Sequence, residues 1–229
     1  MKSEKKPLAE TIKFLTDEEI LKFFVAIRRA RENDAILLRR DLALFHSMLL
    51  FGLRVSEISR IKVENLNLSS KRIFIRGDFH PLSDYGTSLL TEWIEVRSRI
   101  PGARKNPYLF ISTQSSKRGL SGVEIWHLFR KYAKAAGIDS EKRHPSTLRH
   151  SCAMRLVKAG YSGSAIQERL GHKSLLSAEV YLSLSGLPGW SQAAEAVLDI
   201  FEKLTGERHP RPALVDESGI VQYSKHKEI

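Results

Sequence analysis

Residues 166–172 read IQERLGH, and Tyr181 follows nine residues after the histidine that closes this stretch. The apolar spacing before Gly171 predicts a helix over 163–170, and the glycine is typical of a helix end. A further helix is expected over 174–184, and it would carry Tyr181. The stretch therefore predicts a histidine at the break between two short helices and a tyrosine on the second.

Two upstream segments also combine basic residues with helix boundaries. Residues 144–150 read HPSTLRH and begin a helix expected over 146–159. Residues 52–58 read GLRVSEI and follow a helix expected over 37–51, so that Arg54 lies at a turn. Taken alone, each segment has an ordinary explanation, because a turn arginine is commonly solvated and a lone histidine or helical tyrosine commonly belongs to the core. The segments gain weight only in combination.

The remaining sequence indicates more helices and one small β element. Thr16 and Glu19 have the spacing of a capping box, and an amphipathic stripe follows them. Helical spacing is also present at 55–60, 89–97 and 121–136. Residues 72–82 are instead rich in β-formers on either side of a Gly-Asp turn, which predicts a small hairpin or sheet edge. The expected fold class is mainly α with a small β-hairpin or sheet.

The sequence also predicts how the chain is divided. Residues 1–15 are expected to form a short N-terminal arm, 16–205 one domain, and 206–229 an extended or disordered tail. A last helix over 190–205 carries an apolar stripe. This stripe would complete the core or dock in trans on a neighbouring molecule.

Composition restricts the class of protein. The chain has 229 residues with 37 Lys and Arg against 26 Asp and Glu, a net charge of +11. Its only cysteine, Cys152, excludes a disulfide framework and a cysteine metal cage. No apolar run reaches the roughly 18–20 residues of a membrane span, and no secretory signal begins the chain, so a cytoplasmic protein is expected. The basic excess favours an anionic polymer as partner, with an anionic membrane surface as the competing explanation.

Motif searches leave nucleic acid as the best candidate partner. No phosphate loop, dinucleotide fingerprint or zinc-hydrolase motif is present, and no zinc-ligand spacing occurs. Basic pairs suited to DNA contact are Lys117 with Arg118, Arg130 with Lys131, and Lys142 with Arg143. The first pair precedes a predicted helix start, where a backbone phosphate can bind, and the second lies on the polar side of that helix. The alternative is that these residues form solvated faces that give solubility.

In chain order, GLRVSEI, LRHS and IQERLGH with Tyr181 resemble the tyrosine recombinase, or phage integrase, family. The resemblance covers roughly residues 14–185 and implies the fold of that family's catalytic domain. It identifies Arg54, Arg149, His172 and Tyr181 as the catalytic residues. It also implies double-stranded DNA as partner, a homotetramer assembled on paired sites, and no cofactor or metal.

The chemistry implied by the resemblance is coherent. Arg54 and Arg149 would neutralise charge on the non-bridging oxygens of a DNA phosphate, because a guanidinium pairs with phosphate bidentately. His172 would hydrogen-bond the same phosphate, and Tyr181 would attack it to give a 3′-phosphotyrosine and a free 5′-hydroxyl. A phenol with an ordinary pKa of about 10 is a weak nucleophile, so it needs positioning and a nearby base.

Two positions of the family pattern are degenerate. Ser146 stands where relatives usually have histidine, and His144 is the candidate substitute. The lysine that the family carries on a β-hairpin is absent, and Arg76 is its nearest positional substitute, with Lys71 less suitable. Arg76 could neutralise charge but is an inefficient proton donor, because its pKa is above about 12. The alternative for Arg76 is a solvated turn residue or a phosphate contact.

Family members usually carry a further helical domain that closes a clamp around DNA, whereas about 15 residues precede the first helix here. A half-clamp is therefore expected, helped by a partner such as an accessory DNA-binding protein. The leading hypothesis is a site-specific recombinase or integrase of a mobile element. The main alternative is a catalytically impaired DNA-binding protein with the same fold, acting as a regulator, maintenance or architectural factor. Topoisomerase-like relaxation is a third hypothesis.

Overall fold

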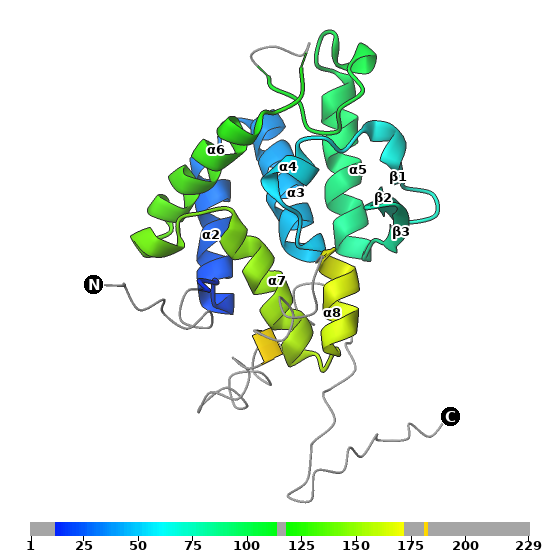
Figure 1. Cartoon of the computed structure of the whole chain (residues 1–229). Helices are drawn as coiled ribbons and strands as arrows, with labels where there is room; N and C mark the ends of the chain where they lie inside the picture. The colour runs from blue at the N-terminus through cyan, green and yellow to red at the C-terminus, as the bar shows by residue number, and fades with distance from the viewer. Residues whose placement is uncertain (1–11, 114–117, 172–180, 183–229) are drawn as a thin grey trace, which may run out of the picture.

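The computed structural model describes residues 12–113, 118–171 and 181–182 (Figure 1). Its α-helices are α2 (Asp17–Ala30), α3 (Ala35–Phe51), α4 (Val55–Ile58), α5 (Asp84–Ser98), α6 (Gly122–Ala135), α7 (Ser146–Lys158) and α8 (Gly163–Leu170). Its strands β1 (Leu66–Asn67), β2 (Arg72–Ile75) and β3 (Asp78–Pro81) form an antiparallel sheet in the order β1-β2-β3. The predicted fold class, mainly α with a small sheet, is confirmed.

The helices begin where the sequence places capping residues. At α2 the Glu19 amide donates to Thr16 Oγ1 at 3.2 Å and the Thr16 amide donates to Glu19 Oε2 at 2.7 Å, which confirms the predicted capping box. Helix α5 starts five residues before the apolar stripe found in the sequence, because the hydroxyl of Ser83 accepts the amide of Gly86 and caps the helix.

Helix α3 forms the centre of the molecule. It lies between α2 and α5 in Figure 1 and also packs against α7. Side chains are buried on most of its surface, in agreement with its dense apolar sequence. The rings of Phe23 and Phe129, whose centroids are 5.0 Å apart, join α2 to α6 beside Phe45 of α3. This core fixes the end of α3 at the position where the GLRVSEI segment begins.

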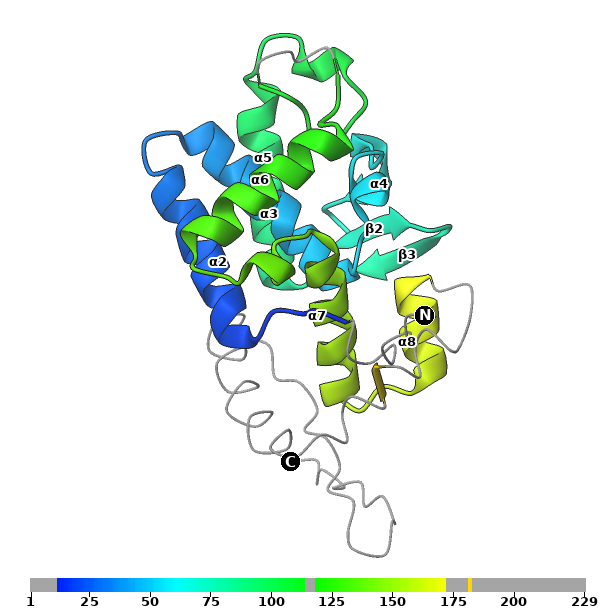
Figure 2. The same cartoon turned by 60° about the vertical axis from the view of Figure 1, so that its left-hand side comes forward.

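The β2–β3 hairpin carries a tight turn toward the helices. Ile73 and Ile75 are buried in β2, and Ile75 pairs with Asp78 of β3. The turn between them consists of Arg76 with φ +55° and Gly77 with φ +88°, as in hairpin turns that need two left-handed residues. Figures 1 and 2 show this hairpin next to α8.

Helices α7 and α8 form a second apolar cluster. It contains Cys152, Met154, Ile166 and Leu170, and Tyr181 packs into it. Residues 12–15, at the end of the predicted arm, also attach here, because the amide of Leu15 donates to Ser151 Oγ at 2.8 Å. The short segment 181–182 is helical and lies against α7 in Figure 2.

Several predicted segments lie outside the described residues. These are residues 1–11 of the predicted arm, the helix over 190–205, the tail over 206–229 and all but residues 181–182 of the helix expected over 174–184. In the part of the chain that the structure describes, no helix combines the length and apolar character needed to cross a membrane.

Candidate active site

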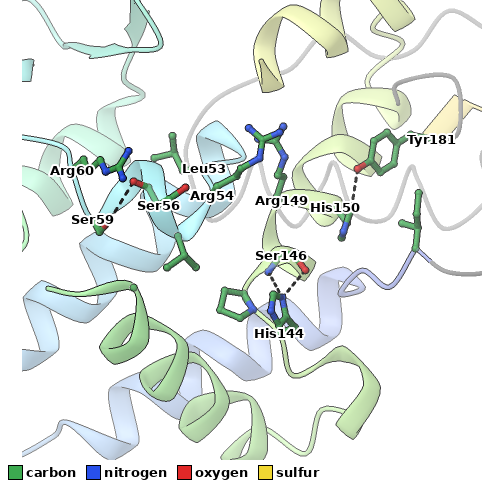
Figure 3. A pocket seen from close by; sticks show the side chains of 14 residues that line it. Leu53, Arg54, Ser56, Ser59, Arg60, His144, Ser146, Arg149, His150 and Tyr181 are labelled. Atoms are coloured by element: carbon green, nitrogen blue, oxygen red, sulfur yellow. Dashed lines mark hydrogen bonds between the residues drawn. The ribbon is translucent and has the colours of Figure 1, made fainter. Parts of the chain in front are cut away.

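A cleft of about 830 Å³ opens between the start of α4, the start of α7 and the segment that carries Tyr181. Figure 3 shows its lining side chains. Three of the predicted catalytic residues, Arg54, Arg149 and Tyr181, line this one cleft. The residues come from segments that are far apart in sequence, so their meeting is a property of the fold.

Arg54 enters the cleft from the turn between α3 and α4. Gly52, with φ +57°, ends α3, and Arg54 has extended backbone before the first residue of α4. The side chain of Arg54 is 49% exposed, and its guanidinium lies 3.6 Å from a carboxylate oxygen of Glu57. Figure 3 shows it beside Arg149. An arginine so exposed and so close to a second one is suited to an anionic ligand.

Arg149 is held by backbone carbonyls at the ends of two helices, α3 and α8. It is only 5% exposed, and its Nη1 donates to the carbonyl of Gly52 at 2.6 Å while Nη2 donates to the carbonyl of Leu170 at 2.7 Å. Burial, and next the nearby charge of Arg54, lower the pKa of Arg149 to about 10. The guanidinium therefore stays charged at neutral pH and links the end of α3 to the end of α8.

Glu57 is a residue of this site that the sequence analysis did not single out. Its carboxylate accepts the amide of Arg54 at 2.6 Å and two donors of Arg76 at 2.8 and 2.9 Å, and it lies 3.9 Å from Nη1 of Arg149. Burial acts to raise the pKa of Glu57, but the hydrogen bonds from Arg76 and from the Arg54 amide outweigh it and lower the pKa. Its position three residues after Arg54 was the available signal.

Arg76 is neither a solvated turn residue nor part of the cleft lining. Its side chain is 16% exposed. Besides Glu57, its guanidinium binds the carbonyls of Phe51 at 3.2 Å, Gly52 at 3.2 Å and Arg169 at 2.7 Å. The solvated alternative is therefore wrong, and the reason is that the tight hairpin turn directs this side chain between α4 and α8.

Ser146, at the degenerate position of the family pattern, is in contact with His144. Nδ1 of His144 lies 2.7 Å from Oγ of Ser146 and accepts the Ser146 amide at 3.2 Å. Both residues line the cleft. The His144 ring therefore reaches past Pro145 to the side chain that stands at the degenerate position.

Tyr181 is paired with a second residue that sequence analysis did not assign. Its hydroxyl lies 2.7 Å from Nδ1 of His150, which follows Arg149 in α7 (Figure 3). Burial raises the pKa of Tyr181, which is 3% exposed, while the charge of Arg149 acts in the opposite direction. Burial, then Arg149 and His144, lower the pKa of His150 to about 4. The imidazole is therefore neutral at pH 7.

Comparison with known sequences identifies the family. Residues 13–186 match the profile of the phage integrase family. The chain belongs to this family. It is 28% identical over 204 residues to tyrosine recombinase XerA of Thermococcus kodakarensis, a match that covers 85% of this chain and 66% of the relative. It is 31% identical over 130 residues to the type 1 fimbriae regulatory protein FimB of Escherichia coli K12, covering 54% of this chain and 63% of the relative.

Solved structures of the family agree with the fold. The crystal structure of XerA recombinase superposes with a TM-score of 0.63 at 23% identity, covering 86% of this chain and 66% of that one. The structure of XerH site-specific recombinase bound to its difH substrate before cleavage superposes with a TM-score of 0.63 at 27% identity. This match covers 74% of this chain and 49% of the XerH chain. This integrase-family chain thus spans about half to two thirds of the length of the relatives it matches.

The basic residues predicted to bind DNA have different surroundings in this integrase-family chain. Arg118 is exposed and pairs with Glu124, whose pKa falls to about 2 chiefly through that bond. Arg130 lies with its guanidinium 4.5 Å from the Trp126 ring centre, and the neighbouring Lys131 is exposed. Arg118 lies before the start of α6, whereas Arg130 and Lys131 are exposed near its C-terminal end.

Lys142 and Arg143 instead interact with other residues of the chain. The Lys142 ammonium pairs with Glu19 at 2.8 Å, and Arg143 Nε donates to the carbonyl of Ile138 at 2.6 Å. Two further predicted site residues, His172 and Lys117, lie outside the described residues.

Proposed function

We propose that this chain cleaves and rejoins double-stranded DNA at specific sites through a covalent 3′-phosphotyrosine at Tyr181. The observation that carries the proposal is the shared cleft of Arg54, Arg149 and Tyr181. The names of the relatives, tyrosine recombinases XerA and XerD, support it.

The arginines would bind the scissile phosphate before any bond breaks. Arg149 is buried and already fixed by two carbonyls, so little reorganisation is needed when DNA arrives. Arg54 is half exposed and would contact the phosphate from beside Arg149. His172, assigned from the family resemblance, would add a third donor, and His144 with Ser146 would line the rest of the phosphate site.

Arg76 would hold the turn that carries Arg54 in place without contacting the phosphate. Its fork is occupied by Glu57 and three carbonyls, so we assign it the positioning of the GLRVSEI turn and no proton transfer. This occupation, together with serine at position 146, favours a second candidate function. In it the chain binds DNA as a regulator, maintenance or architectural factor and cleaves it slowly or not at all.

The partner would be duplex DNA. XerH is bound to its DNA substrate in the solved complexes, and the exposed charges on α6 of this chain suit phosphate contacts. We extend the proposal to one catalytic domain over 16–205 and to a homotetramer assembled on paired DNA sites. Residues 190–205 would dock in trans on a neighbouring protomer, and an accessory DNA-binding protein would assist. The recombinase itself would act in the cell interior, where DNA is.

The test uses a DNA duplex selected from a randomised pool by its affinity for the protein. A nick placed near the cleavage position lets the short 5′-hydroxyl strand diffuse away and traps a covalent adduct. We expect an adduct with the wild-type chain and none with Tyr181→Phe. Tight binding without adduct at every nick position would contradict cleavage and would support the DNA-binding alternative.

A further inference from the structure

The hydroxyl of Tyr181 has a defined partner in the cleft, the imidazole of His150. The 2.7 Å separation between the hydroxyl oxygen and Nδ1 is that of a short hydrogen bond. A neutral imidazole with its hydrogen on Nε2 leaves Nδ1 as an acceptor, and a phenol is the natural donor to it. Because His150 directly follows Arg149 in α7, the same helical turn supplies a phosphate-binding fork and a basic nitrogen.

We propose that Nδ1 of His150 accepts the phenolic proton of Tyr181 when the phenol attacks the DNA phosphate. This rests on the proposed function. As the O–P bond forms, the phenol O–H bond breaks and an N–H bond forms at Nδ1. The P–O5′ bond breaks with its electron pair on the 5′-oxygen, which takes a proton from solvent. In the rejoining step the 5′-hydroxyl attacks phosphorus and loses its proton to solvent, the bond between phosphorus and the phenolic oxygen breaks, and the proton returns from His150 to the departing phenolate.

No other described side chain of the cleft suits the task as well. Among the described residues that line it, the ionisable groups other than the arginines and Tyr181 are His144 and His150. Nδ1 of His144 accepts the Ser146 amide and contacts its hydroxyl, so this nitrogen is already engaged within its own segment. The hydroxyl of Ser146 is too weakly basic to remove a proton from a phenol.

Charge around His150 would make the step depend on DNA. The groups that act on His150 are Arg149 and His144 from its own side of the cleft and Tyr181 from the facing segment. At neutral pH the imidazole is neutral and able to accept. A proton on the imidazole is disfavoured first by burial and then by the positive charge of Arg149, and a bound phosphate would offset the second of these. The nucleophile would therefore lose its proton more readily when the phosphate is in place.

The test measures adduct formation on the selected nicked duplex for the wild type, His150→Asn and Tyr181→Phe. Asparagine keeps a hydrogen-bond acceptor near the position of Nδ1 but cannot take a proton. We expect His150→Asn to slow adduct formation at least about a hundredfold, to remove the histidine-dependent limb of the pH–rate profile, and to leave DNA affinity unchanged. The half-buried His80 of β3, outside the cleft, gives the matched control His80→Asn with the wild-type rate.

A second substrate separates the nucleophile from the leaving group. In a duplex with a 5′-bridging phosphorothiolate, the sulfur leaves without needing a proton. We expect the His150→Asn defect to persist on it, since the phenol must still lose its proton. A wild-type rate for His150→Asn on the ordinary duplex, or full recovery on the phosphorothiolate, would overturn the proposal, while the wild-type adduct would leave the proposed function standing.

A measurement without DNA tests the geometry itself. Nitrogen-15 NMR of the full chain, with the His150 signals identified from their loss in His150→Asn, reports which ring nitrogen carries hydrogen. We expect hydrogen on Nε2 and a bare Nδ1 at pH 7, with Nδ1 shifting in Tyr181→Phe. Hydrogen on Nδ1, or no response to Tyr181→Phe, would overturn the pairing on which the proton transfer depends.

Discussion

At the scale of single residues, Arg54 and Arg149, two of the arginines that line the cleft, have different roles. Arg149 is buried and satisfies two backbone carbonyls, whereas Arg54 is half exposed and forms one long ion pair with Glu57. The first therefore belongs to the fold as well as to the phosphate site. The second is expected to serve the phosphate almost alone.

This difference predicts separable effects on stability and cleavage. Arg149→Gln leaves carbonyls of Gly52 and Leu170 without their charged donor and should lower the free energy of unfolding by about 2–4 kcal/mol. Arg54→Gln should change it by less than about 0.5 kcal/mol. Both should reduce adduct formation at least about a hundredfold. Urea unfolding beside adduct assays checks this, and equal stability losses in the two variants would contradict it.

Gly52 is required for two reasons at once. Its φ of +57° disfavours a side chain, and a Cβ would lie 2.2 Å from Leu170 Cδ2. Gly52→Ala should therefore cost about 2 kcal/mol of stability or more. Gly137 is the matched control, because its φ is +71° but nothing lies within 4 Å of its Cβ position. Gly137→Ala should cost about 1 kcal/mol, and thermal unfolding that gives the same cost for both would show that the contact with Leu170 does not matter.

At the scale of elements, one carboxylate joins α4, the hairpin and α7. Glu57 accepts from Arg76 at the hairpin turn and faces Arg149 of α7. The pKa of Glu57 is lowered, so the unfolded chain binds its proton more readily than the folded one. Its contribution to stability is therefore present above the unfolded pKa of about 4.5 and is lost as pH falls through the lower folded pKa.

Glu57→Gln should accordingly make the free energy of unfolding less dependent on pH in the acid range. At pH 7 the variant should lose about 2 kcal/mol, because it breaks charge-assisted hydrogen bonds. Between pH 5 and pH 3 the wild type should lose more stability than the variant, so that the two curves approach each other. Urea titrations at several pH values measure both curves. Parallel curves across this range would contradict the assigned role.

The sequence predicted the helices well where a cap and an apolar stripe coincide. The capping box of Thr16 and Glu19 and the end of α3 at Gly52 are examples. Strand β1 was not predicted, because two residues carry no alternation. The start of α5 was placed too late, because its first turn is polar and only the cap of Ser83 marks it.

The site was predictable only in part, for a related reason. Arg54, Arg149 and Tyr181 stand in recognisable motifs. The partners Glu57 and His150 gain their roles from residues that folding brings to them, Arg76 at 19 positions and Tyr181 at 31 positions away. No local pattern records such a pairing. The hairpin turn that directs Arg76 inward depends equally on how β3 returns beside β2.

At the scale of the whole molecule, the net charge of +11 should govern DNA affinity. Each phosphate neutralised adds about 0.9 to the slope of log affinity against log salt. The exposed Arg130 of α6 should contribute such a contact, so Arg130→Gln should reduce the slope by about 1. Lys142, paired with Glu19, should contribute less, and Lys142→Gln is the matched control. Binding isotherms at several salt concentrations test this, and identical slopes would place the DNA elsewhere.

The whole account depends on an attack by one phenol. The most direct measurement is to trap the wild-type chain on the selected nicked duplex, digest the adduct with protease and nuclease, and map the modified residue by mass spectrometry. The account predicts a nucleotide joined through its 3′-phosphate to Tyr181. A nucleotide on another residue, or a 5′-phosphate linkage, would contradict it.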